Sequence, residues 1–400
     1  MAPSLDSLPA ELVEAIAQDI TDYADQHQSL FSLRSTCRAM EAGTRRSFAK
    51  RYFSSRTVDM VSDSLEELVA ISKVRDLAAS FTDLRFASED DGIARLPSVA
   101  EAASGDGSGT RFNAFSITAG PLLTLALSGL PNVKDFHFVE RRPFHRAAEG
   151  YDPYNITSTF ATALGAMHAC GTQPREIQMY ADSSLTVNTG ILEEFAAFCF
   201  TRLCSCLEVL QLVVLDIGHE QPFDDQEPLG IRLGTQFALT VPHLTSLREL
   251  HLDFSGSWYS KSILHHIASC QPLPPLSFLN LLSCAVEPHD LFGLLQACRL
   301  TLKVLYCLQL SLLGDSRAWL LKIFCLIGAE MTLQRLKLDQ VSVEEGMLEF
   351  PNLYSALFWN DEEEEDYIWV ERVYGVNFSG AEEVTRGVGQ MPESMVIVAR

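Results

Sequence analysis

The chain has 400 residues, and 47% of them are hydrophobic, which excludes global disorder and allows a large buried core. Thirty lysines and arginines stand against 52 aspartates and glutamates, so the formal net charge is −22. Because such a chain repels phosphate groups, we expect no nucleic-acid partner and no anionic membrane. No apolar run reaches the roughly 18 residues that a membrane span requires.

The N-terminal residues MAPSLDSLPAEL lack the basic and apolar regions of a signal peptide, so we expect a cytoplasmic or nuclear protein with reduced cysteines. The nearest cysteine pair, Cys204 and Cys206, has no second pair at zinc-site spacing. His265 and His266 have no third ligand nearby in the sequence, and we interpret them as a structural pair. No catalytic or nucleotide-binding motif is present. We therefore expect no metal, no cofactor and no enzymatic activity.

Three short helices are predicted between Leu8 and Phe53. Pro9 suits a first helical position, and the first helix then carries one apolar stripe, formed by Leu12, Val13, Ile16 and Ile20. Apolar residues at steps of three and four continue in the second helix, as Leu30, Leu33, Cys37 and Met40. We expect this helix to end at Gly43 and the third helix to begin at Thr44. So small a bundle has little core of its own, and its apolar surface needs a partner.

These residues resemble the F-box family. The segment from Leu8 to Ile16 matches its LPxELxxxI pattern, and Leu33-Arg34-x-x-Cys37-Arg38 matches its second signature. The polar linker from Asp19 to Gln28 is longer than the turn usual in that family. The resemblance covers about one eighth of the chain. It implies docking on a Skp-type adaptor and, through the adaptor, on a cullin. The alternative is a helical cap on the domain that follows.

From about residue 60 a second pattern recurs: an apolar residue, two others, then apolar-x-apolar. Its copies predict short, half-buried strands centred on Leu210, Leu250, Leu279, Leu305 and Leu336. Weaker copies surround three further pairs, which are Leu84 with Phe86, Phe136 with Phe138, and Ile177 with Met179. The last four leucines of the main series are 29, 26 and 31 residues apart, which is a repeat spacing.

Helical patterns lie between these strands, at 160–170, 191–204, 262–270, 290–300 and 316–327. The alternation resembles the leucine-rich-repeat family, although the asparagine or cysteine position after LxxLxL is poorly kept. The resemblance implies stacked parallel strands with helices on the outer side. A doubly wound α/β domain also alternates strands and helices, but it requires a ligand site at the strand ends, and no glycine fingerprint appears there.

Insertions interrupt the repeats at 87–109, 140–154 and 217–230, and we expect them to be loops. The second insertion contains a basic tract, Arg141, Arg142, His145 and Arg146, which is either a solvated loop or a site for an acidic or phosphorylated partner. Six consecutive carboxylates follow at 361–366, and strands are expected at 367–374 and 395–398 as a cap on the last repeat.

The sequence therefore predicts an α/β repeat protein with an F-box-like module at 1–56, a degenerate leucine-rich-repeat solenoid at 57–345 and a C-terminal cap at 346–400. Resemblance to fungal-type F-box/leucine-rich-repeat proteins implies a substrate receptor of an SCF-type ubiquitin ligase that recruits a protein for degradation. The expected adaptor-binding residues are Leu8, Pro9, Leu12, Ile16, Leu33, Cys37 and Met40. The alternative function is a repeat scaffold outside any ligase.

Overall fold

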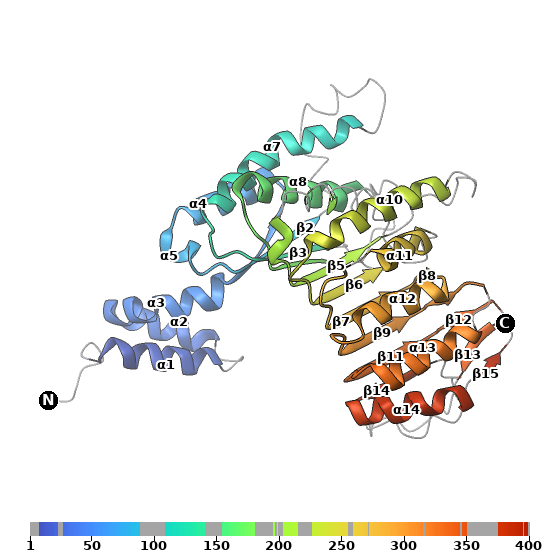
Figure 1. Ribbon diagram of the computed structural model, residues 1–400. Helices are drawn as coiled ribbons and strands as arrows, with labels where there is room; N and C mark the ends of the chain where they lie inside the picture. Colours follow the sequence, from blue (N-terminus) through green and yellow to red (C-terminus); the bar gives the residue numbers. More distant parts are fainter. Residues whose placement is uncertain are drawn as a thin grey trace, which may run out of the picture. The chain divides into compact units, whose positions relative to one another are not determined.

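The protein is an α/β protein whose main sheet is open and mostly parallel, as a computed structural model shows (Figure 1). The structure describes residues 8–22, 27–88, 109–140, 154–180, 195–196, 198, 203–214, 226–254, 259–270, 272–314, 317–344, 346–349, 375–394 and 396–398. The chain divides into two compact units. The first comprises Met1–Ala147 with Gly165–Pro174, and the second comprises Ala148–Leu164 with Arg175–Arg400.

The first unit begins with three helices and continues with a three-stranded parallel arrangement. The helices are α1 (Ala10–Asp22), α2 (His27–Thr36) and α3 (Arg38–Phe53). The strands are β1 (Ser55–Asp59), β2 (Asp83–Ser88) and β3 (Asp135–Glu140), and β2 pairs with both of the others. The helices around them are α4 (Ser62–Ser72), α5 (Arg75–Ala78) and α7 (Gly109–Ser128).

The predicted ends of the N-terminal helices were wrong. Helix α2 ends at Thr36 and α3 begins after the extended residue Cys37, so Gly43 and Thr44 lie inside one continuous helix. The Thr44 hydroxyl donates to the Met40 carbonyl at 2.6 Å within α3 and does not cap a helix. The linker is also shorter than predicted, because α1 extends to Asp22 and α2 starts at His27.

In the second unit the strands follow one another in chain order. They are β4 (Glu176–Tyr180), β5 (Val209–Val213), β6 (Glu249–Asp253), β7 (Phe278–Leu282), β9 (Val304–Leu308) and β11 (Arg335–Asp339). Their pairings are parallel, and the register aligns Ile177 with Leu210, Leu250, Leu279, Leu305 and Leu336. The apolar positions of the sequence pattern are thus the buried core positions of adjacent strands, as predicted.

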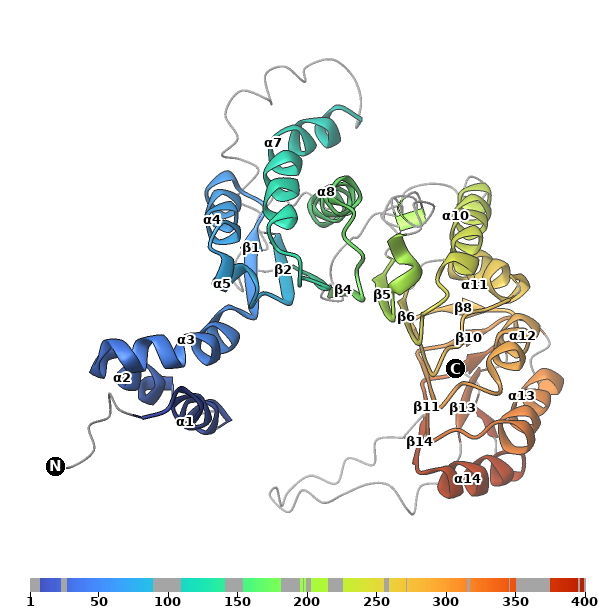
Figure 2. The same ribbon diagram turned by 60° about the vertical axis from the view of Figure 1, so that its left-hand side comes forward.

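Helices follow the strands and lie along one side of them in this unit (Figure 2). They are α10 (Gln226–Thr240), α11 (Tyr259–Ser269), α12 (Pro288–Cys298) and α13 (Arg317–Glu330), and α8 (Tyr154–Cys170) precedes β4. Short 3-10 helices occur at Leu203–Cys206 and Val241–His243. The helices predicted at 160–170, 262–270, 290–300 and 316–327 are confirmed, whereas most of 191–204 lies outside the described residues.

The turns after three successive strands share one backbone conformation. Ser283, Gln309 and Gln340 all have a φ of 53°, which non-glycine residues adopt rarely. After each turn a two-residue strand begins a second sheet: β8 (Ala285–Val286), β10 (Ser311–Leu312) and β12 (Ser342–Val343). The residues before these strands, Cys284, Leu310 and Val341, are buried. They occupy the position where the leucine-rich-repeat pattern has asparagine or cysteine, which Cys284 keeps and which Leu310 and Val341 replace with an aliphatic side chain.

The C-terminal segment closes the end of both sheets. Strand β14 (Gly375–Ser379) pairs antiparallel with β11, and α14 (Ala381–Ser394) packs on α13. In the second sheet β13 (Gly346–Glu349) pairs with β12 and with β15 (Val396–Val398), so the strand predicted at 395–398 is present. The predicted strand at 367–374 and the acidic segment 361–366 lie outside the described residues.

Several elements carried weak sequence signals. Strand β1 reads SRTVD and buries only Val58, and α7 contains Gly120 and Pro121. Residues 226–230, predicted as a loop, belong to α10.

No described helix has both the length and the apolar character needed to cross a membrane.

Candidate functional site

The buried side of α1 packs tightly against α3. Val13 and Ala17 are 3% and 0% exposed, and they face the middle of the longer helix. A Cβ atom at Gly43 would lie 2.7 Å from Cγ1 of Val13, so any larger residue there would force Val13 or the helix to shift. Gly43 is therefore required for the close approach of α1 and α3, and not for ending a helix.

A neighbouring face of α1 leaves two large apolar side chains in solvent. Leu12 is 52% exposed and Ile16 is 42% exposed, and a spacing of four residues puts them on adjacent turns of one helical face. Pro9, also exposed, directly precedes the helix, and its carbonyl accepts hydrogen bonds from the amides of Leu12 and Val13. We call Leu12 and Ile16 the exposed α1 face.

The other predicted adaptor-binding residues are less accessible. Leu8, Leu33 and Cys37 are half-buried, whereas Met40 is 1% exposed. Met40 belongs to α3 and not to α2, because the backbone changes direction at Cys37, so the helical spacing from Leu33 does not continue to it. Met40 is a core residue of the three helices and cannot contribute to a surface.

Phe31 on α2 is exposed, although the sequence pattern did not single it out. It is 52% exposed, and its ring lies 5.2 Å from that of Phe48 and 5.0 Å from that of Tyr52, measured between centroids. The Arg34 guanidinium lies 4.0 Å from the Phe48 ring centroid. Phe48 and Tyr52 are four residues apart and so lie on one face of α3, but the contact of this face with α2 depends on tertiary packing.

Helix α3 also contacts the strand–helix segment that follows it. Phe53 and Phe81 have ring centroids 6.4 Å apart, and Arg45 pairs with Asp76 of α5 at 3.0 Å. The ion pair is exposed at both ends and adds little stability, so the aromatic contact is the more important of the two. The three helices are thus attached to this unit through α3.

The solvent side of the second unit's sheet carries a row of rings on three adjacent strands. His251 of β6 stacks on Phe278 of β7 at 4.5 Å, and Phe278 meets Tyr306 of β9 edge-to-face at 5.3 Å. Burial lowers the pKa of His251 below 6.5, and the neighbouring Glu249 carboxylate, 3.7 Å away, opposes this shift. These residues alternate with the buried leucines, as strand geometry requires.

Four of the described cysteines behave as small apolar residues. Those that the structure describes are free thiols, and Cys204, Cys284, Cys298 and Cys307 are buried. Burial raises the pKa of Cys298 to about 11 and that of Cys307 to about 12, so both remain protonated at neutral pH.

The basic tract of Arg141, Arg142, His145 and Arg146 lies outside the described residues, so it is not assigned to the exposed α1 face or to the row of rings on the sheet.

Comparisons with protein-family models and with curated proteins found no match for this chain. The candidate sites are therefore the exposed α1 face and the aromatic row of the sheet, both defined by their own geometry.

Proposed function

We propose that this protein is the substrate-recognition subunit of an SCF-type ubiquitin ligase. In this proposal α1–α3 form an F-box-like module that binds a Skp-type adaptor and, through it, a cullin. The strands and helices that follow form a leucine-rich-repeat solenoid that binds a protein substrate. The chain performs no chemistry and instead raises the concentration of the substrate near the ubiquitin-loaded enzyme.

The observation that carries the proposal is the exposure of Leu12 and Ile16. An exposed apolar residue by itself is normal in a protein surface, but two on adjacent turns form the kind of ridge that fits a partner groove. Both residues belong to the segment that matches the LPxELxxxI pattern. Leu33 and Cys37, which match the second F-box signature in the sequence, are half-buried in the same three helices.

Two features of the second unit support the repeat part of the proposal. The leucines at successive strand centres are aligned from β5 to β11, and the turns after β7, β9 and β11 repeat one unusual conformation. Both are expected when one structural unit is stacked on the next. The row formed by His251, Phe278 and Tyr306 then offers rigid aromatic side chains to a protein partner.

One observation favours the alternative, a repeat scaffold without a ligase. Because Phe53 packs on Phe81, the helices attach to the neighbouring strand–helix segment in the manner of a terminal cap. A cap, however, buries its apolar side against the repeats, whereas Leu12 and Ile16 remain accessible. Binding of an adaptor to the exposed α1 face would distinguish the ligase subunit from the repeat scaffold.

The test is co-purification of the full chain with a purified Skp-type adaptor. We expect the wild-type chain to form a stable complex and the Leu12→Asp/Ile16→Asp variant to lose it by at least about 100-fold in affinity, because two charges would enter an apolar interface. The control is Leu125→Asp on α7, which places one such charge at a leucine that is 54% exposed.

Retention of binding by the control and loss by the double variant, with unchanged circular dichroism, would support the receptor function. Absence of adaptor binding by the folded wild-type chain would overturn it and leave the scaffold function. Equal loss in Leu125→Asp would show that the effect is not specific to α1.

A further inference from the structure

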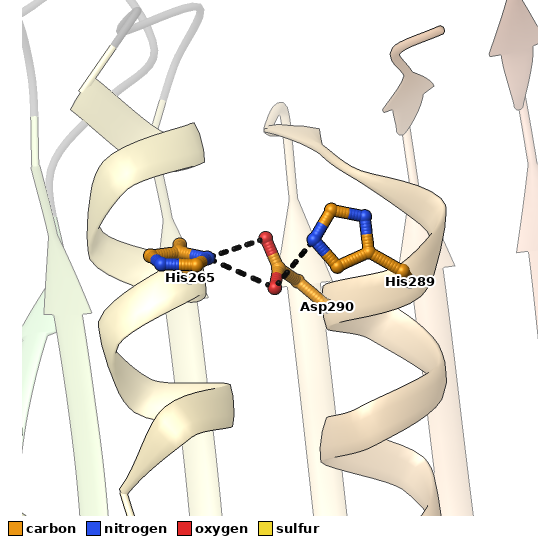
Figure 3. Close-up of side chains that lie close together, drawn as sticks. All are labelled: His265, His289 and Asp290. Atoms are coloured by element: carbon orange, nitrogen blue, oxygen red, sulfur yellow. Dashed lines mark hydrogen bonds and ion pairs between the residues drawn. The ribbon is translucent and has the colours of Figure 1, made fainter. Parts of the chain in front are cut away.

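Two histidines and one aspartate converge on a single point between α11 and α12 (Figure 3). His265 lies on α11, and His289 and Asp290 lie in the first turn of α12. Nδ1 of His265 is 3.0 and 3.1 Å from the two carboxylate oxygens of Asp290, and Nε2 of His289 is 3.3 Å from one of them. One ligand atom from each of the three residues lies within 4.8 Å of the others.

We propose that His265, His289 and Asp290 bind a divalent transition-metal ion such as Zn²⁺. The set of two imidazole nitrogens and one carboxylate oxygen matches the donor preference of such ions. With ligand bonds of about 2.0–2.2 Å, two ligands of a tetrahedral ion are about 3.3 Å apart. The distances from both imidazoles to Asp290 are already close to this value, and the two histidine nitrogens lie within 4.8 Å of each other, so they must move closer together when an ion binds.

The exposure of the three side chains fits a metal site with an open position. Asp290 is 5% exposed, while the side chains of His265 and His289 are 53% and 49% exposed. A buried carboxylate requires a cation or hydrogen-bond donors, and in the described part of the chain only these two histidines pair with it. The site is therefore held at its base by Asp290 and remains open to solvent, where water completes the coordination.

Contacts around the three residues fix the position of α11 relative to the start of α12. The Ser260 hydroxyl of α11 donates to the Ala285 carbonyl at 3.1 Å and accepts from the Ala285 amide at 2.9 Å. Lys261 of the same helix pairs with Glu287, the residue before α12, at 2.7 Å. The ring of His289 is backed by Trp319 of α13, with centroids 6.1 Å apart. The ligands are thus positioned before any ion binds, which lowers the entropic cost of binding.

The inference is independent of the proposed ligase function, because α11 and α12 contain none of the predicted adaptor-binding residues. It also differs from the sequence-based expectation that no metal is bound. His265 and Asp290 are 25 residues apart, and only the packing of successive helices brings them together.

The experiment is equilibrium dialysis of the full chain against Zn²⁺, with Co²⁺ as a spectroscopic probe. We expect one ion per chain in the wild type, and at least about 100-fold weaker binding in Asp290→Asn, because loss of a ligand should exceed the effect of losing an outer-shell partner. His265→Ala/His289→Ala should bind none at this site. The matched control is His266→Ala. In the wild type, Nδ1 of His266 is hydrogen-bonded to the Ser262 carbonyl at 2.7 Å, and His266 is not one of the three proposed ligands.

Two further measurements guard against misfolded variants and against binding by cysteine. The Co²⁺ complex should show visible bands of a nitrogen–oxygen site and lack a thiolate charge-transfer band. In the wild-type chain, imidazole ¹⁵N spectra should show Zn²⁺ on Nδ1 of His265 and on Nε2 of His289. Three results would each overturn the proposal: equal Zn²⁺ binding by the wild type and Asp290→Asn, a thiolate band in the Co²⁺ spectrum, or imidazole ¹⁵N signals that do not change with Zn²⁺. The three residues would then form a hydrogen-bonded cluster without metal.

Discussion

The N-terminal helices and the strand–helix units of the second compact unit differ in how far their apolar side chains are exposed. In the repeats the central leucines, such as Leu250, Leu279 and Leu305, are at most 4% exposed, because each is covered by the equivalent residue on both sides. In α1 only one side is covered, and Leu12 and Ile16 are left in solvent. A stacked unit has two neighbours, whereas a three-helix bundle has too little interior for all of its apolar residues.

Exposure of a single apolar side chain is therefore not by itself a sign of a binding surface. Leu300 in the repeats is 77% exposed, more than Leu12, but it follows α12 as an isolated residue and requires no explanation. The exposed α1 face is informative because its residues occur together on adjacent turns of one helix. The same comparison yields three predictions on stability, in which the repeats and the helices should respond differently.

The largest effect should come from shortening a central leucine of the repeats. Leu279→Ala removes a side chain that is 0% exposed and aligned between Leu250 and Leu305, and it should lower the free energy of unfolding by about 2–5 kcal/mol. Leu12→Ala, at a half-exposed position, should change it by no more than about 0.5 kcal/mol. Urea unfolding monitored by circular dichroism measures both, and equal effects would contradict the comparison.

A smaller effect is expected at the contact of α1 with α3. Gly43→Val places a side chain against Val13 and should destabilise the three helices by about 1–3 kcal/mol. Hydrogen–deuterium exchange should accelerate in α1 and remain unchanged from β6 to β11. In the background of Val13→Ala the cost should fall by about 1 kcal/mol, because the clashing methyl groups are absent. A cost that is independent of Val13 would show that the close approach is not the cause.

The smallest effect concerns the aromatic row of the sheet. Because the pKa of His251 is lowered on folding, the unfolded chain binds more protons below about pH 6.5, and stability falls as the pH decreases through this range. His251→Gln removes this contribution. Its midpoint of thermal unfolding should therefore decrease less between about pH 7.5 and about pH 5.5 than that of the wild type. His168→Gln on α8, an exposed histidine, serves as the control. A parallel decrease in wild type and His251→Gln would exclude this residue as a source.

Much of the fold was predictable because its signal is local. The LxxLxL spacing marks strand centres at Leu250, Leu279, Leu305 and Leu336, and the register follows once the strands are stacked in parallel. Helix ends in the N-terminal module were less predictable, since Gly43 occupies a position that either ends a helix or permits a close contact. Of the residues predicted to bind an adaptor, Leu12 and Ile16 are exposed and Met40 is buried.

The sequence by itself determined the alternation of strands and helices, since side-chain periodicity and turn residues act over a few positions. It also determined where the apolar residues of α1 recur, but not which of them face outward. Only the tertiary structure decided that Met40 and Val13 are buried, and that Asp290 lies between His265 and His289. Contacts between residues distant in the sequence depend on how elements pack, and packing is set by the whole neighbouring surface rather than by spacing along the chain.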